Sequence, residues 1–232
     1  MNDEPSSPLG RGPCKGLGAR SMPEAPDTDH PVAAEYRSLA GRYDARWARY
    51  IEASIRATLV HADVQGYERV LDVGCGTGVL LAELGRQQPQ ARLTGVDLVG
   101  EMLAVAQERL PEETELMTAP AEALPFEDAT FEVVISSSVL HYIRQPQRAL
   151  DETARVLVPG GRLVLTDWCR DYVTMRALDW YLRGTDPGHC RTLRSRDLSR
   201  LASASGLEVE HLDRYRLDWF WGLMTLTARR PQ

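Results

Sequence analysis

The spacing of apolar and polar residues changes several times along the chain. Before residue 70, aromatic and small apolar residues recur at steps of four, three, four and three, which places them on one face of a helix. They are Tyr36, Ala40, Tyr43, Trp47 and Tyr50, and the apolar stripe continues, after an expected bend, through Ile51, Ile55 and Leu59. The segment 32–66 is therefore predicted to form N-terminal helices.

From residue 70 onward, short apolar runs alternate with segments of helical spacing. The runs are Val70–Val73, Leu93–Val96, Val133–Ile135 and Leu163–Leu165, and the helical segments lie near residues 78–88, 100–110 and 146–157. Strands that alternate with helices are typical of βαβ units, which build a mainly parallel sheet. The pattern thus predicts an α/β fold.

The end of the chain departs from this alternation. Ser195 is expected to begin a last helix, which Gly206 would end. The strand-like runs Leu207–Tyr215 and Trp219–Thr227 follow without a helix between them, so they must pair as an antiparallel hairpin. A single domain over 32–232 is predicted, with N-terminal helices (32–66), a core (67–167), a helical cover (168–206) and a terminal hairpin (207–232).

Composition and charge exclude several classes of protein. The chain carries 27 Lys+Arg against 33 Asp+Glu, a balance that argues against nucleic acid as a partner. No apolar run approaches the roughly 18 residues that span a bilayer. Six of the 14 prolines lie in residues 1–31, which are therefore expected to be a disordered tail, and either Met1 or Met22 is a possible native start.

The cysteines indicate neither a disulfide framework nor a metal site. Cys14, Cys75, Cys169 and Cys190 show no CxxC spacing, and no apolar secretory signal precedes them, so we expect a reduced cytoplasmic protein. No cluster has the spacing of metal ligands, and no metal ion is expected. A thiophilic acceptor such as arsenite, held by Cys169, Cys190 and His189, is a minor alternative because no two cysteines are adjacent.

The strongest chemical signal is the glycine-rich segment VLDVGCGTG at residues 70–78. Glycines let the backbone turn sharply and approach a ligand, and the helix that follows presents free N–H groups at its start. The dinucleotide fingerprint is not met, because its third glycine would fall at Val79, and no Gly-Lys-Ser/Thr sequence forms a P-loop. Asp72 would face a pyrophosphate badly and suits a ligand with a positive group.

A second acidic residue ends the next strand-like run. Asp97 follows Gly78 by 19 residues. A carboxylate at this place can accept hydrogen bonds from both hydroxyls of a ribose. Alternatively, Asp97 could only cap the helix that begins near Gly100. Because Asp97 occurs together with the glycine loop, binding of a ribose is favoured.

Four segments together resemble the class I S-adenosylmethionine-dependent methyltransferases, in particular the small-molecule branch that includes the ubiquinone/menaquinone C-methyltransferases. They are VLDVGCGTG at 70–78, GVDLVGEMLAVAQERL at 95–110, PAEALPFEDATFEVVISSSVLHYI at 120–143 and LDETARVLVPGGRLVLTDW at 150–168. The resemblance implies a Rossmann-like sheet of seven strands, S-adenosyl-L-methionine as cofactor, and in-line methyl transfer to a small aromatic or otherwise apolar acceptor. The alternatives are a cofactor-binding regulator or assembly partner without turnover, and an NAD-dependent dehydrogenase.

The resemblance also implies which residues bind the cofactor. They are Tyr43, Asp72, Gly74, Cys75, Gly76, Gly78, Asp97, Leu98, Ala121, Glu122 and Ser136. Asp72 and the Ser136 carbonyl would lie near the ammonium of the cofactor, Asp97 would hold the ribose, and Leu98 would pack on the adenine. Cys75 is expected to pack rather than react. Pro120 stands where the family often has an aspartate that accepts from the adenine amino group.

The aromatic residues suggest where the acceptor binds. Of the 16 aromatic residues only three, Phe126, Phe131 and Tyr142, lie between residues 70 and 167. In the resembled family the flanking parts cover the cofactor and shape the acceptor pocket, and aromatic faces tolerate a nearby cation. The expected pocket residues are Tyr36, Trp47, Trp168, Tyr172, Trp219 and Trp221. Ordinary core packing is the alternative for each of them.

Two residues are candidates for a catalytic role. His141 follows Ser136 by five residues and could act as a general base, because an imidazole titrates near neutral pH. Asp167 ends a strand-like run and could orient an acceptor. The alternatives are that His141 covers a helix end and that Asp167 caps the next helix. The sequence does not indicate which atom is methylated or what the oligomeric state is.

Overall fold

The computed structural model describes residues 43–232 of the chain. Helix α2 starts at Tyr43, although the side chain of Tyr43 is not described. The expectations for the tail 1–31, for Tyr36 and for the Tyr43 side chain as a cofactor-binding group therefore lie outside the described residues.

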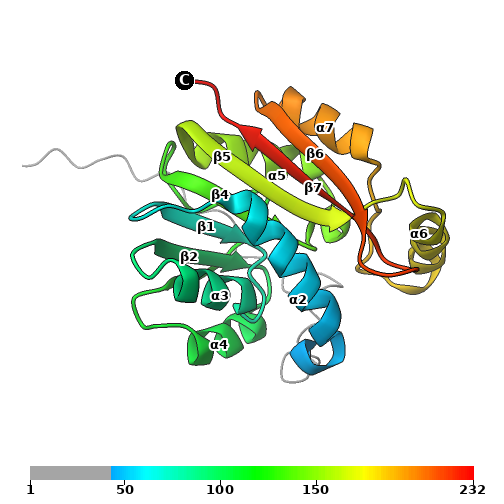
Figure 1. The fold of residues 1–232 in the computed structure, drawn as a ribbon, viewed down its shortest axis with the longest axis horizontal. Coiled ribbons are helices and arrows are strands. Elements are labelled where there is room, and N and C mark those ends of the chain that lie inside the picture. Colours follow the sequence, from blue (N-terminus) through cyan, green and yellow to red (C-terminus); the bar gives the residue numbers. More distant parts are fainter. Residues whose placement is uncertain (1–42) are drawn as a thin grey trace, which may run out of the picture.

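A seven-stranded sheet forms the centre of the molecule (Figure 1). The strands are β1 (Arg69–Val73), β2 (Arg92–Asp97), β3 (Glu115–Thr118), β4 (Phe131–Ser137), β5 (Leu157–Trp168), β6 (Glu208–Arg216) and β7 (Gly222–Arg229). Their order is β3-β2-β1-β4-β5-β7-β6; the first five are parallel, and β7 runs antiparallel to both of its neighbours. The predicted α/β class and the predicted terminal hairpin are confirmed.

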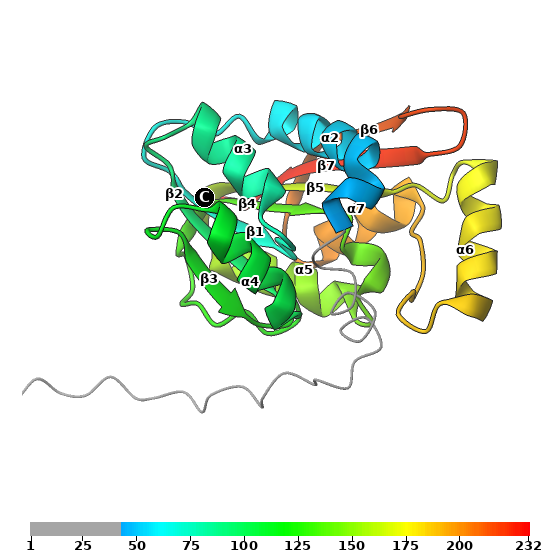
Figure 2. The same cartoon turned by 90° about the horizontal axis from the view of Figure 1, so that it is seen from below.

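Helices cover both faces of this sheet (Figure 2). They are α2 (Tyr43–Ala62), α3 (Val79–Gln87), α4 (Gly100–Arg109), α5 (Pro146–Val156), α6 (Val173–Thr185) and α7 (Ser195–Ala204), with a short 3-10 turn at Leu140–Tyr142. Neighbouring strand residues face opposite sides, so Val70 packs with α2 and α3 whereas Leu71 packs with α5 and α7. Because both faces are buried, the central strands are continuous apolar runs.

Two local features differ from the expectations. Helix α2 is a single helix through Ile51, where a bend was expected. Strand β3 has no apolar run to signal it, because it lies at the edge of the sheet and only Leu116 among its four residues is half-buried. None of the helices in residues 43–232 is both long and apolar enough to cross a membrane.

The order of the strands determines where a ligand can bind. After β3 the chain returns to the other side of β1 and forms β4, so the connections from β1 and β4 leave the sheet in opposite directions. Open α/β sheets bind ligands at the carboxyl ends of the strands beside such a reversal. The loops after β1, β2 and β4 are therefore the expected site.

Helix α6 lies at one end of the sheet, beside the turn between β6 and β7 (Figures 1 and 2). The Thr174 hydroxyl donates to the Phe220 carbonyl at 2.7 Å. Tyr172, just before the helix, packs directly against the Cα of Gly222. The helical cover (168–206) is thus joined to the β6–β7 hairpin by side chains that contact the hairpin backbone.

We predict that Gly222→Ala destabilises the fold whereas Gly184→Ala does not. A Cβ on Gly222 would lie 2.1 Å from the Tyr172 ring, which must shift, at a cost of about 1–3 kcal/mol in the free energy of unfolding. A Cβ on Gly184, within α6, meets nothing within 4 Å, and Ala stabilises a helix by roughly 0.5–1 kcal/mol relative to Gly. Urea unfolding measures both. A Gly222→Ala protein as stable as the wild type would contradict the close packing.

Candidate functional site

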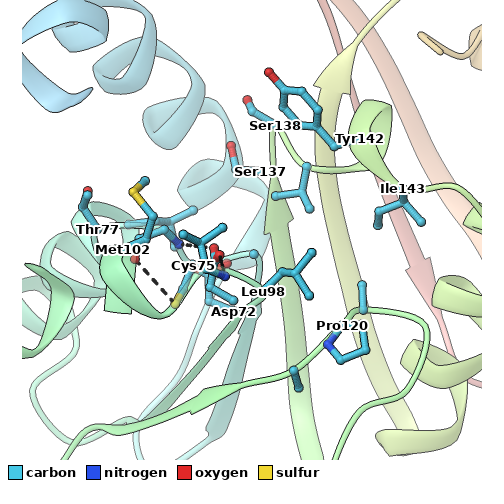
Figure 3. Close-up of a pocket in the computed structure, with 18 of the residues that line it drawn as sticks. Asp72, Cys75, Thr77, Leu98, Met102, Pro120, Ser137, Ser138, Tyr142 and Ile143 are labelled. Carbon is cyan, nitrogen blue, oxygen red and sulfur yellow. Dashed lines mark hydrogen bonds between the residues drawn. The ribbon is translucent and has the colours of Figure 1, made fainter. Parts of the chain in front are cut away.

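A cavity of about 560 Å³ opens at the carboxyl ends of β1, β2 and β4 (Figure 3). Its lining comes from the glycine loop after β1, the loops after β2, β3 and β4, and one face of α2. Figure 3 shows Asp72, Cys75 and Thr77 on one side of the space and Pro120 and Ile143 on the other. The cavity therefore lies at the reversal of strand order where a ligand site was expected.

The glycine loop forms the floor of this cavity. Gly74, Gly76 and Gly78 have φ angles of 77°, 55° and 74°, a left-handed conformation that residues with side chains seldom adopt. A Cβ on Gly74 would also lie 2.3 Å from the Val139 side chain, in the loop after β4. Glycine is thus required both by the turn and by the close approach of the two loops.

Asp72 is a buried carboxyl group at the end of β1. Its side chain lines the cavity, and the residue is 2% exposed. Among residues 43–232 no group is in hydrogen-bonding position to donate to this carboxylate. Burial, together with the charge of Asp97, raises the pKa of Asp72 to about 8. The site therefore favours a ligand that brings a positive charge to Asp72.

Asp97 links the ends of β1 and β2. One carboxylate oxygen accepts the Gly76 N–H at 2.8 Å and the other accepts the Val99 N–H at 2.9 Å. Burial raises the pKa of Asp97, and these backbone bonds partly oppose the rise. The carboxylate thus holds the glycine loop and the start of α4 together, and it still lines the cavity, where its remaining lone pairs can accept from a ligand.

The residues expected around the adenine lie along the apolar side of the cavity. Leu98, Ala121 and Glu122 all line it, as does Pro120. The Glu122 carboxylate accepts the Gln145 N–H at 3.4 Å, which ties this side to the start of α5. Pro120 supplies no side-chain acceptor at that position, so the expectation that the backbone or Glu122 recognises the adenine amino group stays a prediction.

The serines at the end of β4 are placed differently from one another. Ser136 is buried, its hydroxyl donates to the Val73 carbonyl at 2.8 Å, and it does not line the cavity. Ser137 and Ser138 line the cavity instead, and Ser138 has a φ of 64°, unusual for a residue other than glycine. Strand β4 continues to Ser137, two residues beyond the apolar run that ends at Ile135, which moves the exposed backbone beyond Ser136.

Most of the predicted pocket aromatics form a cluster behind the cavity wall. Trp47 and Trp221 pack edge to face with ring centroids 6.2 Å apart, and Trp168 lies 5.4 Å from Trp221. Tyr172 packs against Gly222, and Trp219 is 80% exposed. None of these five residues lines the cavity formed by the described residues.

Several residues with hydroxyl groups that the sequence did not single out as site residues line the cavity. They include Tyr50, Thr77, Ser137, Ser138 and Tyr142. The Tyr50 hydroxyl bonds to the Ser138 hydroxyl at 2.6 Å and accepts the Trp168 indole N–H at 2.8 Å. Tyr50 shared a predicted helix face with Trp47, so the periodicity pointed to the right face of α2 without showing which ring reaches the ligand.

His141 and Asp167 form a buried pair beside this wall. The His141 Nδ1 lies 2.7 Å from one Asp167 oxygen, and the other oxygen accepts the His141 backbone N–H at 3.2 Å. His141 is 3% exposed, stacks on Trp168 with ring centroids 3.8 Å apart, and does not line the cavity. Tyr142, the next residue, does line it. The pair thus fixes the backbone of the loop from which Tyr142 projects.

The three cysteines within residues 43–232 have thiols whose pKa is raised. Cys75 lines the cavity, where burial and the two nearby carboxylates raise the pKa of its thiol strongly. Burial also raises the thiol pKa of Cys169 to about 11 and that of Cys190. A thiolate is the nucleophile and the metal ligand, so a raised pKa lowers the reactive fraction of each of these thiols. Within residues 43–232, no three His, Cys, Asp or Glu side chains are grouped to hold a metal ion.

Comparison with known proteins identifies the family. Residues 71–165 match the family described as "Methyltransferase domain". A phosphatidylethanolamine N-methyltransferase from Cereibacter sphaeroides is 33% identical over 64% of this chain and 73% of its own length. The chain belongs to the S-adenosylmethionine-dependent methyltransferases. A demethylmenaquinone methyltransferase from Clavibacter sepedonicus is 32% identical over 71% of this chain, and the match spans 64% of that relative.

Solved structures share the fold of this methyltransferase. An S-adenosylmethionine-dependent methyltransferase from Mesorhizobium loti superposes with a TM-score of 0.63 at 21% identity, over 77% of this chain and 96% of that one. The [4+2]-cyclase SpnF superposes with a TM-score of 0.72 at 20% identity, over 86% and 96% of the two chains. At this identity the likeness shows the fold alone.

The cavity fits the cofactor of the family. S-adenosylmethionine has a positively charged ammonium and sulfonium, a ribose with two hydroxyls and an apolar adenine. The buried Asp72 lacks a positive partner, Asp97 retains free lone pairs, and Leu98 supplies an apolar surface. Gly74 and Gly76 line the cavity with backbone alone. When bound, the cofactor supplies an electrophilic methyl group.

We predict that the cofactor binds more tightly as the pH rises from 6 to 8.5. Below about pH 8 Asp72 is mostly protonated, so a ligand with an ammonium group must displace that proton. The dissociation constant should fall by up to about tenfold per pH unit in this window and level off above it. Isothermal titration calorimetry with S-adenosylmethionine in buffers of different ionisation enthalpy measures both affinity and proton release.

Asp72→Asn is the control for this pH dependence. The variant has no proton to lose at residue 72, so its pH slope should be much smaller, with only the contribution from Asp97 remaining. Equal slopes in the variant and the wild type would show that Asp72 is not the titrating group.

Proposed function

We propose that this chain transfers the methyl group of S-adenosylmethionine to a small aromatic or otherwise apolar acceptor by in-line displacement. The observation that carries the proposal is the buried Asp72, which has no positive partner and faces a cavity with room beyond the glycine loop. In-line transfer requires the acceptor to be aligned and water excluded, and it requires no covalent intermediate with the protein.

The acceptor end of the cavity is the region around Tyr50, Ser138 and Tyr142. Figure 3 shows Ser138 and Tyr142 close to each other there. The hydroxyls of Tyr50 and Ser138 are held by each other and by Trp168, so their positions are set before a ligand arrives. Ile51 and Ile55 of α2 add apolar surface to the same wall. This combination suits an acceptor with an apolar body and one polar group to be oriented.

The buried pair His141–Asp167 supports a positioning role in this proposal. A general base must lie within hydrogen-bond reach of the proton that it removes. The His141 ring is shut off from the cavity, whereas its backbone and side chain are both bonded to Asp167. We infer that the pair holds Tyr142 and the loop after β4 against the acceptor. A direct catalytic role for either residue remains a prediction from the sequence.

The relatives indicate the type of reaction but do not indicate the acceptor. Their names refer to demethylmenaquinone, phosphatidylethanolamine and malonyl-[acyl-carrier protein], three unlike acceptors. What they share is methyl transfer. The preference for an apolar acceptor therefore rests on the lining of the cavity in this chain.

The proposal is tested with S-adenosylmethionine carrying a radiolabelled methyl group and a panel of phenols, quinols, amines and fatty carboxylic acids. We expect labelled product from at least one aromatic or apolar member, in an amount that matches the S-adenosylhomocysteine formed. Binding of the cofactor without labelled product from any member would favour the regulator alternative. Product only from amines that have neither an aromatic nor an apolar body would contradict the acceptor class.

The roles of His141 and Asp167 are tested by His141→Ala and Asp167→Asn. If the pair positions the acceptor wall, both variants lower kcat/KM for the acceptor by about tenfold or more and leave the dissociation constant of the cofactor within about twofold. A direct base predicts in addition that the pH dependence of kcat changes in His141→Ala. Unchanged turnover in both variants would remove both residues from the mechanism.

A further inference from the structure

Three side chains form a closed ring of bonds outside the glycine loop. The Thr77 hydroxyl donates to one Asp44 oxygen at 2.7 Å, and Arg109 donates to the other at 2.5 Å. The second guanidinium nitrogen of Arg109 donates to the Thr77 carbonyl at 2.5 Å and to its hydroxyl oxygen at 3.0 Å. The ring joins the first turn of α2, the glycine loop and the last residue of α4.

Thr77 connects this ring to the cavity. It lies between Gly76 and Gly78, lines the cavity and is 3% exposed (Figure 3). Its neighbours have no side chains, so the loop is held by backbone bonds, such as that from the Gly76 N–H to Asp97, and by the bonds to Thr77. Arg109 fixes both the carbonyl and the hydroxyl of Thr77 from the outer side.

The ring also holds α2 over the cavity. One face of α2, with Tyr50, Ile51 and Ser54, forms a wall of the cavity, and Asp44 lies in the first turn of the same helix. Farther along, Ile55 packs into the core against the sheet. The later turns of α2 are therefore anchored by apolar packing, whereas its first turn is held to the glycine loop by the charged ring.

The bonds of the ring are weak enough to break and form again. The side chains of Asp44 and Arg109 are 33% and 31% exposed, so solvent and salt screen the ion pair. Its bonds to Thr77 add directionality, because charge-assisted bonds to a fixed backbone carbonyl are strongly oriented. The ring can thus open without unfolding the core.

We propose that the Asp44–Thr77–Arg109 ring is a clasp that retains the cofactor: it positions the glycine loop and holds the first turn of α2 against it. The three residues are positioning residues, since Asp44 and Arg109 do not line the cavity among the described residues. The proposal rests on the proposed function only in taking S-adenosylmethionine as the ligand. Opening of the ring sets the rate at which the ligand leaves.

The test compares Arg109→Gln with the wild type in a chase experiment. Each protein is loaded with radiolabelled S-adenosylmethionine, excess unlabelled cofactor is added, and the dissociation rate is measured at 50 and 500 mM NaCl. We expect Arg109→Gln to release the cofactor about tenfold faster, the effect of losing roughly 1.4 kcal/mol. Salt should speed release from the wild type and have little effect on the variant.

Three further variants separate a clasp from a general loss of stability. Arg86→Gln breaks a surface ion pair with Glu83 on α3, away from the cavity, and should leave release unchanged. Asp44→Asn combined with Arg109→Gln should release the cofactor no faster than Arg109→Gln alone, since both residues belong to one ring. Arg109→Lys keeps the charge and should restore part of the retention.

A measurement without ligand distinguishes failure of the clasp from failure of the proposed function. Hydrogen exchange of the unliganded protein should speed up in residues 74–79 and in the first turn of α2 in Arg109→Gln, but not in α5. If the wild type bound no cofactor, the proposed function would fail, and the exchange result would still test the ring. Unchanged exchange, or release from Arg109→Gln at the wild-type rate, would overturn the proposal.

Discussion

The burial of one carboxyl group at the end of the central strand is the constraint on which the site depends. Asp72 ends β1 in a place where no positive group of residues 43–232 reaches it, and the result is a pKa near 8. An isolated buried charge is costly, so the group stays neutral until a cationic ligand replaces its proton. An uncompensated carboxyl of this kind, in a cavity, is typical of a functional site rather than of a structural core.

The fold builds the rest of the cavity around this group. The loops after β1 and β4 leave the sheet in opposite directions, which opens the cavity between them. Close to the sheet they meet at Gly74 and Val139, and this contact closes the floor of the cavity. Asp97 fixes the glycine loop by accepting the Gly76 N–H, and the Tyr50 hydroxyl joins α2 to Ser138. The site therefore consists of loops from neighbouring strands held by a few bonds between distant segments, which is why it can be both preformed and able to release a ligand.

The sequence predicted what local chemistry and periodicity determine. The apolar runs predicted the central strands, because both faces of those strands are buried. The alternating glycines predicted a tight loop after Asp72, and Asp97 was expected at the end of the next strand. The resemblance to the methyltransferase family came from the four sequence motifs. Strand β3 was not predicted, because an edge strand need not be apolar.

The details that escaped prediction depend on tertiary contacts. Whether Ser136 or Ser138 reaches the cavity is decided by the last residue of β4, and apolar patterning locates strand ends poorly. The tryptophans were assigned to a pocket, but rings such as Trp168 pack behind the wall, and burial alone does not tell a wall from a core. The bond between Asp44 and Arg109 joins residues far apart in sequence, so no local pattern signals it.

The central claim, that the acidic cavity at the reversal of strand order binds the methyltransferase cofactor, is tested most directly by calorimetry. S-adenosylhomocysteine and NAD are each titrated into the wild type and into Asp97→Ala at pH 8.5. The account predicts binding of one S-adenosylhomocysteine per chain, a loss of affinity of at least about tenfold in Asp97→Ala, and no binding of NAD. Binding of NAD alone, or S-adenosylhomocysteine bound equally well by both proteins, would contradict it.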